Sequence, residues 1–182
     1  MSTTSAPVSP VLSELITSIR GAVNAGGGDG VVAERVATFL QPCLERETFL
    51  TPAQREPDPI HYRQHVLHVE ADGSFSIVAL VWLPGQETPI HDHVSWCVVG
   101  VHKGQEYETL YEVETDGSGA SWLVETGQSV NPPGSVAALT PPGDIHKVVN
   151  NGDELAISLH VYGADIGKLG SSIRRRYDHP IR

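Results

Sequence analysis

The chain has 182 residues, 40% of them hydrophobic, and a formal net charge of −10 at neutral pH. This length is enough for one domain with a buried core. The acidic balance argues against general electrostatic binding to nucleic acid or to an anionic membrane, because both are polyanions. No apolar run approaches the ~20 residues that a membrane helix requires. We therefore expect a small-molecule partner, no nucleic acid and no membrane, and leave a monomer and a small homo-oligomer open.

Two observations predict a cytoplasmic location. Residues 1–10 lack the basic-then-apolar pattern of a signal peptide. Cys43 and Cys97 are the only cysteines, and their contexts are unlike the disulfide framework of a secreted domain. We expect both thiols to remain free in a reducing compartment.

Residues 1–60 are expected to form a helical cap and a strap. Apolar residues recur at helical spacing in 11–23, where Ser9 is a suitable cap, and again in 31–44. The glycine-rich break between them lacks the Lys-Ser/Thr and the preceding strand of a phosphate-binding loop. Residues 51–59 contain three prolines, which indicates an extended connection across the surface.

From residue 61 onward the pattern is typical of an antiparallel sandwich or barrel, with short apolar or alternating runs separated by turn residues. The expected strands are 62–69, 75–83, 89–91, 95–102, 106–114, 121–125, 128–130, 135–140, 145–149 and 154–162. Residues 61–165 would form the barrel. For the basic segment 166–182 we favour a solvated tail over an anion contact. The prediction is one mainly β structural domain with an N-terminal helical cap.

The most informative stretch contains His91 and His93. Side chains on a strand repeat every two residues, so these two imidazoles would point to one side and could grip a metal ion. A single His-x-His is common by chance. The stretch becomes specific only together with a second one that ends in His146.

Together, the two stretches resemble the two sequence motifs of the cupin family. The first motif has Gly, five residues, His-x-His, three residues, Glu, six residues and Gly; the matching residues are Gly85, His91, His93 and Gly104. The second motif is matched by Pro141, Gly143, His146 and Asn150, with Gly134 one residue further upstream than usual. The resemblance implies a cupin barrel (a double-stranded β-helix) and a metal ion held by His91, His93 and His146.

Cys97 stands where most cupins have the fourth ligand, a glutamate. Three neutral imidazoles leave the charge of a divalent metal uncompensated and one face open, an arrangement that favours an anionic chelating ligand plus dioxygen. Cys97 as a fourth ligand is the less favoured alternative. In lacking this glutamate the chain resembles the thiol dioxygenases, which include the cysteine and 3-mercaptopropionate dioxygenases. The resemblance implies Fe(II) and oxidation of a small thiol by O2 to a sulfinic acid.

Ser158, His160 and Tyr162, the polar row, would share one face of the last strand, with apolar residues on the other face. A buried hydrogen-bond network is the structural alternative. In the thiol dioxygenases the same spacing forms a relay beside the iron. The resemblance implies that Tyr162 faces the substrate and O2 and that His160 and Ser158 orient it.

The same resemblance gives Cys97 a second role. In animal cysteine dioxygenases a cysteine near this position is joined to the tyrosine by a thioether, whereas the bacterial 3-mercaptopropionate enzymes usually have glycine there. A Cys97–Tyr162 crosslink is therefore a hypothesis.

Members of this family differ in the residue that binds the substrate carboxylate. Cysteine-selective members have an arginine in the first barrel strand, and the 3-mercaptopropionate type has a glutamine in a Tyr-Arg-Gln context, which Gln64 matches here. Alternation places Arg63 on the opposite face. Glutamine cannot neutralise a carboxylate as a guanidinium does. The 3-mercaptopropionate type supplies its arginine from beyond the tyrosine, so one of Arg174, Arg175 and Arg176 is a candidate, and we choose Arg174.

The prediction is a thiol dioxygenase that acts on 3-mercaptopropionate or L-cysteine. A different metal-dependent cupin oxygenase or isomerase would share the three histidines but needs neither the polar row nor Cys97. A non-catalytic small-molecule-binding cupin would show no O2 uptake with any thiol.

Overall fold

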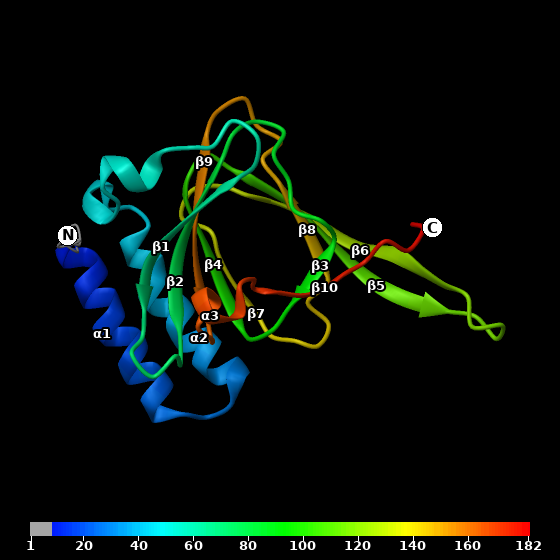
Figure 1. Cartoon of the computed structure of the whole chain (residues 1–182), viewed down its shortest axis with the longest axis horizontal. Helices are drawn as coiled ribbons and strands as arrows, with labels where there is room; N and C mark the ends of the chain where they lie inside the picture. The colour runs from blue at the N-terminus through cyan, green and yellow to red at the C-terminus, as the bar shows by residue number, and fades with distance from the viewer. Residues whose placement is uncertain (1–8) are drawn as a thin grey trace.

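The structure is a computed structural model that describes residues 9–182. Two five-stranded antiparallel sheets form the body of the molecule, with strand orders β1-β2-β9-β4-β7 and β10-β3-β8-β5-β6 (Figure 1). The strands are β1 (Arg63–Val69), β2 (Ser76–Trp82), β3 (His91–His93), β4 (Cys97–Lys103), β5 (Glu106–Thr115), β6 (Ser121–Asn131), β7 (Val136–Leu139), β8 (His146–Val149), β9 (Ala156–Tyr162) and β10 (Ile173–Arg176). This is the predicted mainly β, cupin-type architecture.

The N-terminal part is helical, as predicted. Helix α1 (Pro10–Ala25) begins where the Ser9 hydroxyl accepts a hydrogen bond from the Leu12 N–H at 3.2 Å. Helix α2 (Asp29–Leu40) follows, and the connection to the barrel contains three short 3-10 turns, η1 (Gln41–Cys43), η2 (Glu47–Phe49) and η3 (Pro52–Arg55). The first eight residues of the predicted cap lie outside the described residues. None of the helices in residues 9–182 is long and apolar enough to cross a membrane.

The helices cover the outer face of the first sheet (Figure 1). Apolar residues of α1 and α2 form one buried cluster with the outward-facing residues of β2, β4 and β9. Burial of such side chains stabilises the fold by roughly 25 cal/mol per Å² of apolar surface. Gly100 on β4 permits a close approach, since a Cβ there would lie 2.9 Å from the Leu44 methyl groups.

Strand β9 separates this core from the interior between the sheets. Ile157, Leu159 and Val161 belong to the apolar cluster under the helices, whereas Tyr162 packs in a second cluster with Leu80, Trp82 and Cys97. The predicted alternation of β9 is therefore confirmed.

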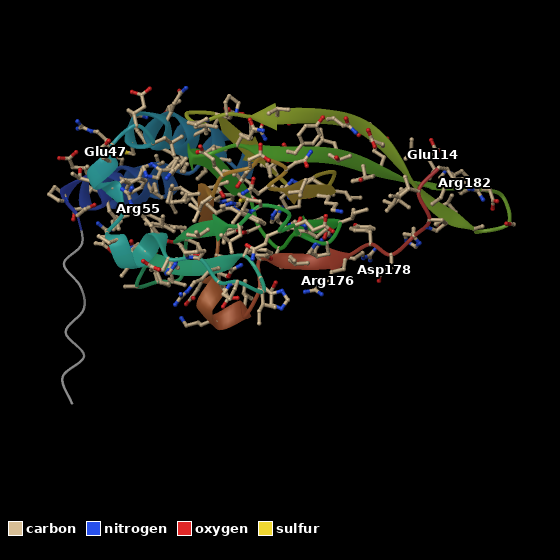
Figure 2. The ribbon with its side chains drawn as sticks, turned by 90° about the horizontal axis from the view of Figure 1, so that it is seen from above. Glu47, Arg55, Glu114, Arg176, Asp178 and Arg182 are labelled. Atoms are coloured by element: carbon tan, nitrogen blue, oxygen red, sulfur yellow. The ribbon has the colours of Figure 1, made fainter. Side chains whose placement is uncertain are left out.

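The C-terminal segment differs from the prediction of a solvated tail. After the short helix α3 (Ile166–Leu169), strand β10 pairs antiparallel with β3, the strand of His91 and His93. The chain then runs along the β5–β6 hairpin, where Leu123 accepts a hydrogen bond from the Arg182 N–H at 2.9 Å. Figure 2 shows Arg182 beside Glu114 of this hairpin. The basic composition suggested solvent, but the unpaired edge of β3 provides hydrogen-bond partners for the backbone.

Residues 121–131 form one strand, β6, and not the two predicted strands. Its pairing with β5 continues through a register shift at Leu110 and Tyr111, so the glycine at 127 does not end the strand. The paired β5 and β6 extend away from the helices (Figure 1).

Candidate metal centre

Two neighbouring strands bring the three predicted histidines together. His91 pairs directly with His146 between β3 and β8, and His93 follows two residues after His91 on the same face. One nitrogen of each ring lies within 4.8 Å of the corresponding atoms of the other two. All three residues are buried. The arrangement is a compact cluster of imidazoles inside the barrel.

Each imidazole is held by a hydrogen bond at its Nδ1 atom. His91 Nδ1 lies 2.9 Å from the Pro89 carbonyl oxygen, and His93 Nδ1 lies 2.9 Å from the Asp144 carboxylate. His146 Nδ1 lies 2.6 Å from Glu108 Oε1. These acceptors fix the N–H on Nδ1 and leave Nε2 with a free lone pair, the form in which histidine binds a metal.

The electrostatics of the cluster fit a metal ion. Burial, together with the charges of His146 and His93, lowers the pKa of His91 to about 3. Burial also lowers the pKa of His93, although the Asp144 carboxylate opposes this shift. His146 Nε2 is buried and has no hydrogen-bond partner among the described residues. A buried nitrogen without a partner costs free energy unless a ligand such as a metal ion binds it.

The histidines open onto an inner cavity of ≈ 20 Å³. Its lining combines the imidazoles with apolar and uncharged polar side chains, namely Tyr62, Gln64, Leu80, Trp82, Thr88, His91, His93, His146, Val148, His160, Tyr162, Ser172 and Ile173. No acidic side chain is part of this lining. In the part of the chain that the structure describes, the three histidines are the only group of at least three His, Cys, Asp or Glu residues that could hold a metal ion.

The polar row forms a continuous chain of hydrogen bonds. The Tyr162 hydroxyl lies 3.2 Å from His160 Nδ1, and His160 Nε2 lies 2.9 Å from the Ser158 hydroxyl. Burial lowers the pKa of His160 well below its usual value, so this ring is neutral. The Tyr162 ring lies 6.1 Å from that of His93. The row therefore ends beside the imidazole cluster.

Cys97 lies next to Tyr162 and apart from the three histidines. The two residues are direct partners across the β4–β9 pair, and both are buried. Burial raises the pKa of the Cys97 thiol well above its usual value, which disfavours the thiolate that would ligate a metal.

An outer funnel borders the inner cavity and shares Tyr62 and Gln64 with it. Arg176 also lines this funnel. Arg176 is the direct partner of His91 on β10, so both side chains face the same side of the sheet. Figure 2 shows Arg176 on this strand.

Arg174, the arginine that the sequence favours, is not part of the funnel lining. The register of β10 shifts between Ile173 and Arg175, and the Arg174 guanidinium donates to the Asp92 carboxylate from Nε at 3.1 Å. Tyr177 donates to the same carboxylate at 2.9 Å. Asp92 faces away from the cavity because it alternates with His91 and His93. In the structure Arg176, and not Arg174, lines the funnel.

Sequence reasoning also missed the carboxylates that hold the histidines. Asp144 lies two residues before His146, yet it binds His93. Glu108 lies on β5 and reaches His146 through the β5–β8 pair. Strand alternation places Glu108 on the same face as Glu106, but no local signal connects it with a histidine that is 38 residues away.

The class of protein is defined by a three-histidine metal site inside a cupin-type fold. Residues 56–171 match the model of the family "Cysteine dioxygenase type I". The chain belongs to this family. The match ends before β10, so the strand that provides Arg176 lies beyond it.

Individual relatives agree with this assignment. The chain is 33% identical over 107 residues to "Cysteine dioxygenase type 1" of Danio rerio, a match that covers 58% of this chain and 52% of that protein. The chain thus spans about half the length of this relative.

Solved structures with a similar course of the chain include two proteins described by their fold. One is a Cupin 2 conserved barrel domain protein from Salinispora arenicola, with a TM-score of 0.43 and 23% identity, covering 62% of this chain and 83% of that one. The other is a protein with a double-stranded β-helix domain from Klebsiella pneumoniae, with a TM-score of 0.48 and 20% identity, covering 66% of this chain and 87% of that one.

Glu108→Gln tests how the centre holds a metal. The amide cannot accept the His146 N–H as strongly as the carboxylate does, so the dissociation constant for Zn²⁺, measured by competition with a chelator, should rise about 10–100-fold. Glu112→Gln, on an exposed position of the same strand, is the matched control and should bind Zn²⁺ like the wild type. Equal affinities for both variants would contradict the assigned role of Glu108.

Proposed function

We propose that this protein is an Fe(II)-dependent thiol dioxygenase that oxidises a small thiol carboxylate with O2 to the corresponding sulfinic acid. The observation that carries the proposal is the buried cluster of His91, His93 and His146 with the polar row ending beside it. Membership of the cysteine dioxygenase type I family supports the same activity.

The donor set explains why a thiol is the proposed substrate. Three neutral imidazoles compensate none of the charge of a divalent ion, and the lining of the inner cavity adds no carboxylate. Bound Fe(II) would favour the thiolate form of the substrate and supply the open positions at which thiolate and O2 combine.

The protein's own residues bind, orient and shield the substrate. Leu80, Val148 and Ile173 line the inner cavity and exclude water from it. Burial raises the pKa of Tyr162 well above its usual value, so its hydroxyl remains protonated and acts as a hydrogen-bond donor. The hydrogen bond between this hydroxyl and His160 Nδ1 orients the hydroxyl, and the tautomer of His160 decides which of the two groups donates.

The funnel favours a carboxylate without a neighbouring ammonium group. Arg176 provides the positive charge and Gln64 an amide at the entrance, and the Glu87 carboxylate of the same lining is paired with Lys147 at 2.7 Å. The inner cavity has no acidic side chain that would pair with the ammonium group of cysteine. We therefore favour 3-mercaptopropionate over L-cysteine.

A cytoplasmic location also remains a proposal. Its support is that Cys43 and Cys97 are both free in the structure, as expected in a reducing compartment.

The activity is tested with an oxygen electrode and the iron-loaded protein. We expect O2 uptake with one sulfinate formed per O2, faster with 3-mercaptopropionate than with cysteine or cysteamine. Sulfinate is quantified by mass spectrometry, and the metal-free protein is the control. Absence of stoichiometric sulfinate with all three thiols would disprove the activity and favour a different metal cupin or a binding protein.

Arg176→Gln tests the carboxylate site. Loss of a charge-assisted hydrogen bond is worth about 1.5–3 kcal/mol, so KM for 3-mercaptopropionate should rise about tenfold or more, with a smaller change in kcat. Cysteamine has no carboxylate and should show no such change. The matched control is Arg175→Gln, since Arg175 lies opposite Asp92 in the β10–β3 register and its guanidinium lies 5.7 Å from the Tyr177 ring. Equal KM values for the two variants would exclude Arg176.

The proposed thioether between Cys97 and Tyr162 is supported by their direct pairing on adjacent strands. Its formation joins Sγ to a ring carbon and breaks one S–H and one C–H bond, and the two protons and two electrons reduce O2 to H2O2. After turnover with iron, thiol and O2, a digest should contain one linked peptide that is lighter by two hydrogens than the sum of its parts. Cys97→Ser is the control. Separate peptides after turnover would contradict the crosslink.

A further inference from the structure

Glu106 has a buried carboxyl group that takes no part in the proposed reaction. Only 1% of its surface is exposed, and its Oε1 atom has no hydrogen-bond partner within residues 9–182. It is the first residue of β5, two residues before Glu108. Burial of an acidic group without a compensating cation is costly, so its presence here calls for a function.

The neighbours of Glu106 connect it to the polar row. The hydrogen-bonding groups beside its carboxyl are the Ser158 hydroxyl and the Trp82 indole. Trp82 Nε1 also donates to the Ser158 oxygen at 3.2 Å. Glu106 therefore lies at the end of the row opposite to Tyr162.

Glu106 also lines a second cavity. It has a volume of ≈ 40 Å³, and its mainly apolar lining includes five polar side chains, Glu106, Glu108, Asn131, Ser135 and His146. This volume has room for water, and polar groups line it. Asn131 and Ser135 are only half-buried. Water in this cavity would give Glu106 a route for proton exchange that does not pass through the substrate.

We propose that Glu106 is a positioning residue that sets the direction in which the polar row donates its protons. This inference rests on the proposed function, because the direction matters for a substrate beside Tyr162. Glu106 itself does not touch the substrate.

The ionised state of Glu106 fixes one direction. A carboxylate only accepts, so the Ser158 hydroxyl donates to it. The Ser158 oxygen then accepts the N–H of Trp82 and that of His160 Nε2. His160 Nδ1 has a free lone pair in this tautomer and accepts the proton of Tyr162. The Tyr162 hydroxyl then points away from the inner cavity.

The protonated state of Glu106 reverses the row. Its carboxyl donates to Ser158, and the Ser158 hydroxyl donates to His160 Nε2. His160 now has its N–H on Nδ1 and donates to the Tyr162 oxygen. The Tyr162 proton is free to point into the inner cavity and to donate to the substrate or to O2. His160 is neutral in both states, so only its tautomer changes.

The charges around Glu106 place this change in the physiological range. Burial, with a contribution from the Glu108 carboxylate, raises the pKa of Glu106 to about 7, although hydrogen bonds from Ser158 and Trp82 oppose this shift. The other titratable groups that sense Glu106 are Cys97 on β4 and Tyr162 on β9, and burial raises the pKa of both. They stay neutral across the range in which Glu106 titrates.

The test is the tautomer of His160, read by ¹⁵N NMR of histidine-labelled protein loaded with Zn²⁺. Three imidazoles bind this diamagnetic ion, so the measurement does not depend on catalysis. In the wild type we expect the N–H on Nδ1 at low pH and on Nε2 at high pH, with a midpoint near the Glu106 pKa of about 7. A His160→Gln variant assigns the signals.

Glu106→Gln keeps the shape of the side chain and removes its ionisation. The amide donates to Ser158 at every pH, so His160 should keep the N–H on Nδ1. Ser158→Ala interrupts the row and should also abolish the change. Glu112→Gln, exposed on the same strand, is the matched control and should switch like the wild type. A wild-type His160 with one tautomer throughout, or a switch that persists in Glu106→Gln, would overturn the proposal.

Activity of the iron-loaded protein provides the second readout. If donation by Tyr162 is required, kcat of the wild type should fall about tenfold for each pH unit above the midpoint, because each unit reduces the protonated fraction by that factor. Glu106→Gln should lose this alkaline decrease. A wild-type decrease that Glu106→Gln retains would count against the proposal. A tautomer switch in a protein that oxidises no thiol would support the role of Glu106 and disprove the proposed function.

Discussion

The imidazoles of His91, His93 and His146 lie in a buried site where each ring donates its Nδ1 proton to a fixed acceptor and directs Nε2 to a common point. Burial keeps His91 and His93 neutral, and neutral histidine is the form that binds a metal. The arrangement depends on the pairing of β3 with β8, because a shift of one residue would turn the rings to the opposite face. The rest of the barrel maintains this register and restricts the access of water.

The three acceptors are not equivalent, and this has consequences for the site. Pro89, two residues before His91, provides a backbone carbonyl, whereas Asp144 and Glu108 provide carboxylates. A carboxylate makes the imidazole a stronger donor to a metal ion. The negative charge that cupins commonly place directly on the metal, as a fourth ligand, lies here one hydrogen bond further out. The open side of the centre therefore remains available to an anionic ligand.

Two chains of hydrogen bonds meet around this centre and have different roles. The carboxylate–histidine pairs are fixed and hold the metal ligands. The polar row has two possible directions because every member from Ser158 to Tyr162 can both donate and accept. Glu106 differs from Glu108 in this respect. Hydrogen bonds from His146 and its neighbours keep the pKa of Glu108 low despite burial, whereas that of Glu106 is raised. Of these two carboxyl groups on β5, Glu108 is thus suited to a permanent negative charge and Glu106 to a charge that changes with pH.

Periodicity along the chain predicted much of the fold of this protein. The spacing of apolar residues determined both helices, and alternation with a period of two placed His91 with His93 and separated the polar row from the apolar face of β9. The motif spacing indicated the cupin fold and the thiol dioxygenase resemblance, which the family match confirms. These features are local or depend on the order of short motifs, so the sequence alone was sufficient.

The tertiary structure decided which groups meet across strands. The register shift in β10 directs Arg174 to Asp92 and Arg176 to the funnel, a choice that three consecutive arginines do not reveal. Pairing with β3 converted the expected tail into a strand, and pairing of β5 with β8 brought Glu108 to His146. The position of Glu106 beside Ser158 likewise joins residues far apart in sequence. The physical reason is that alternation fixes only the face to which a side chain points, whereas its partner depends on strand order and register, which are set by the packing of the whole barrel.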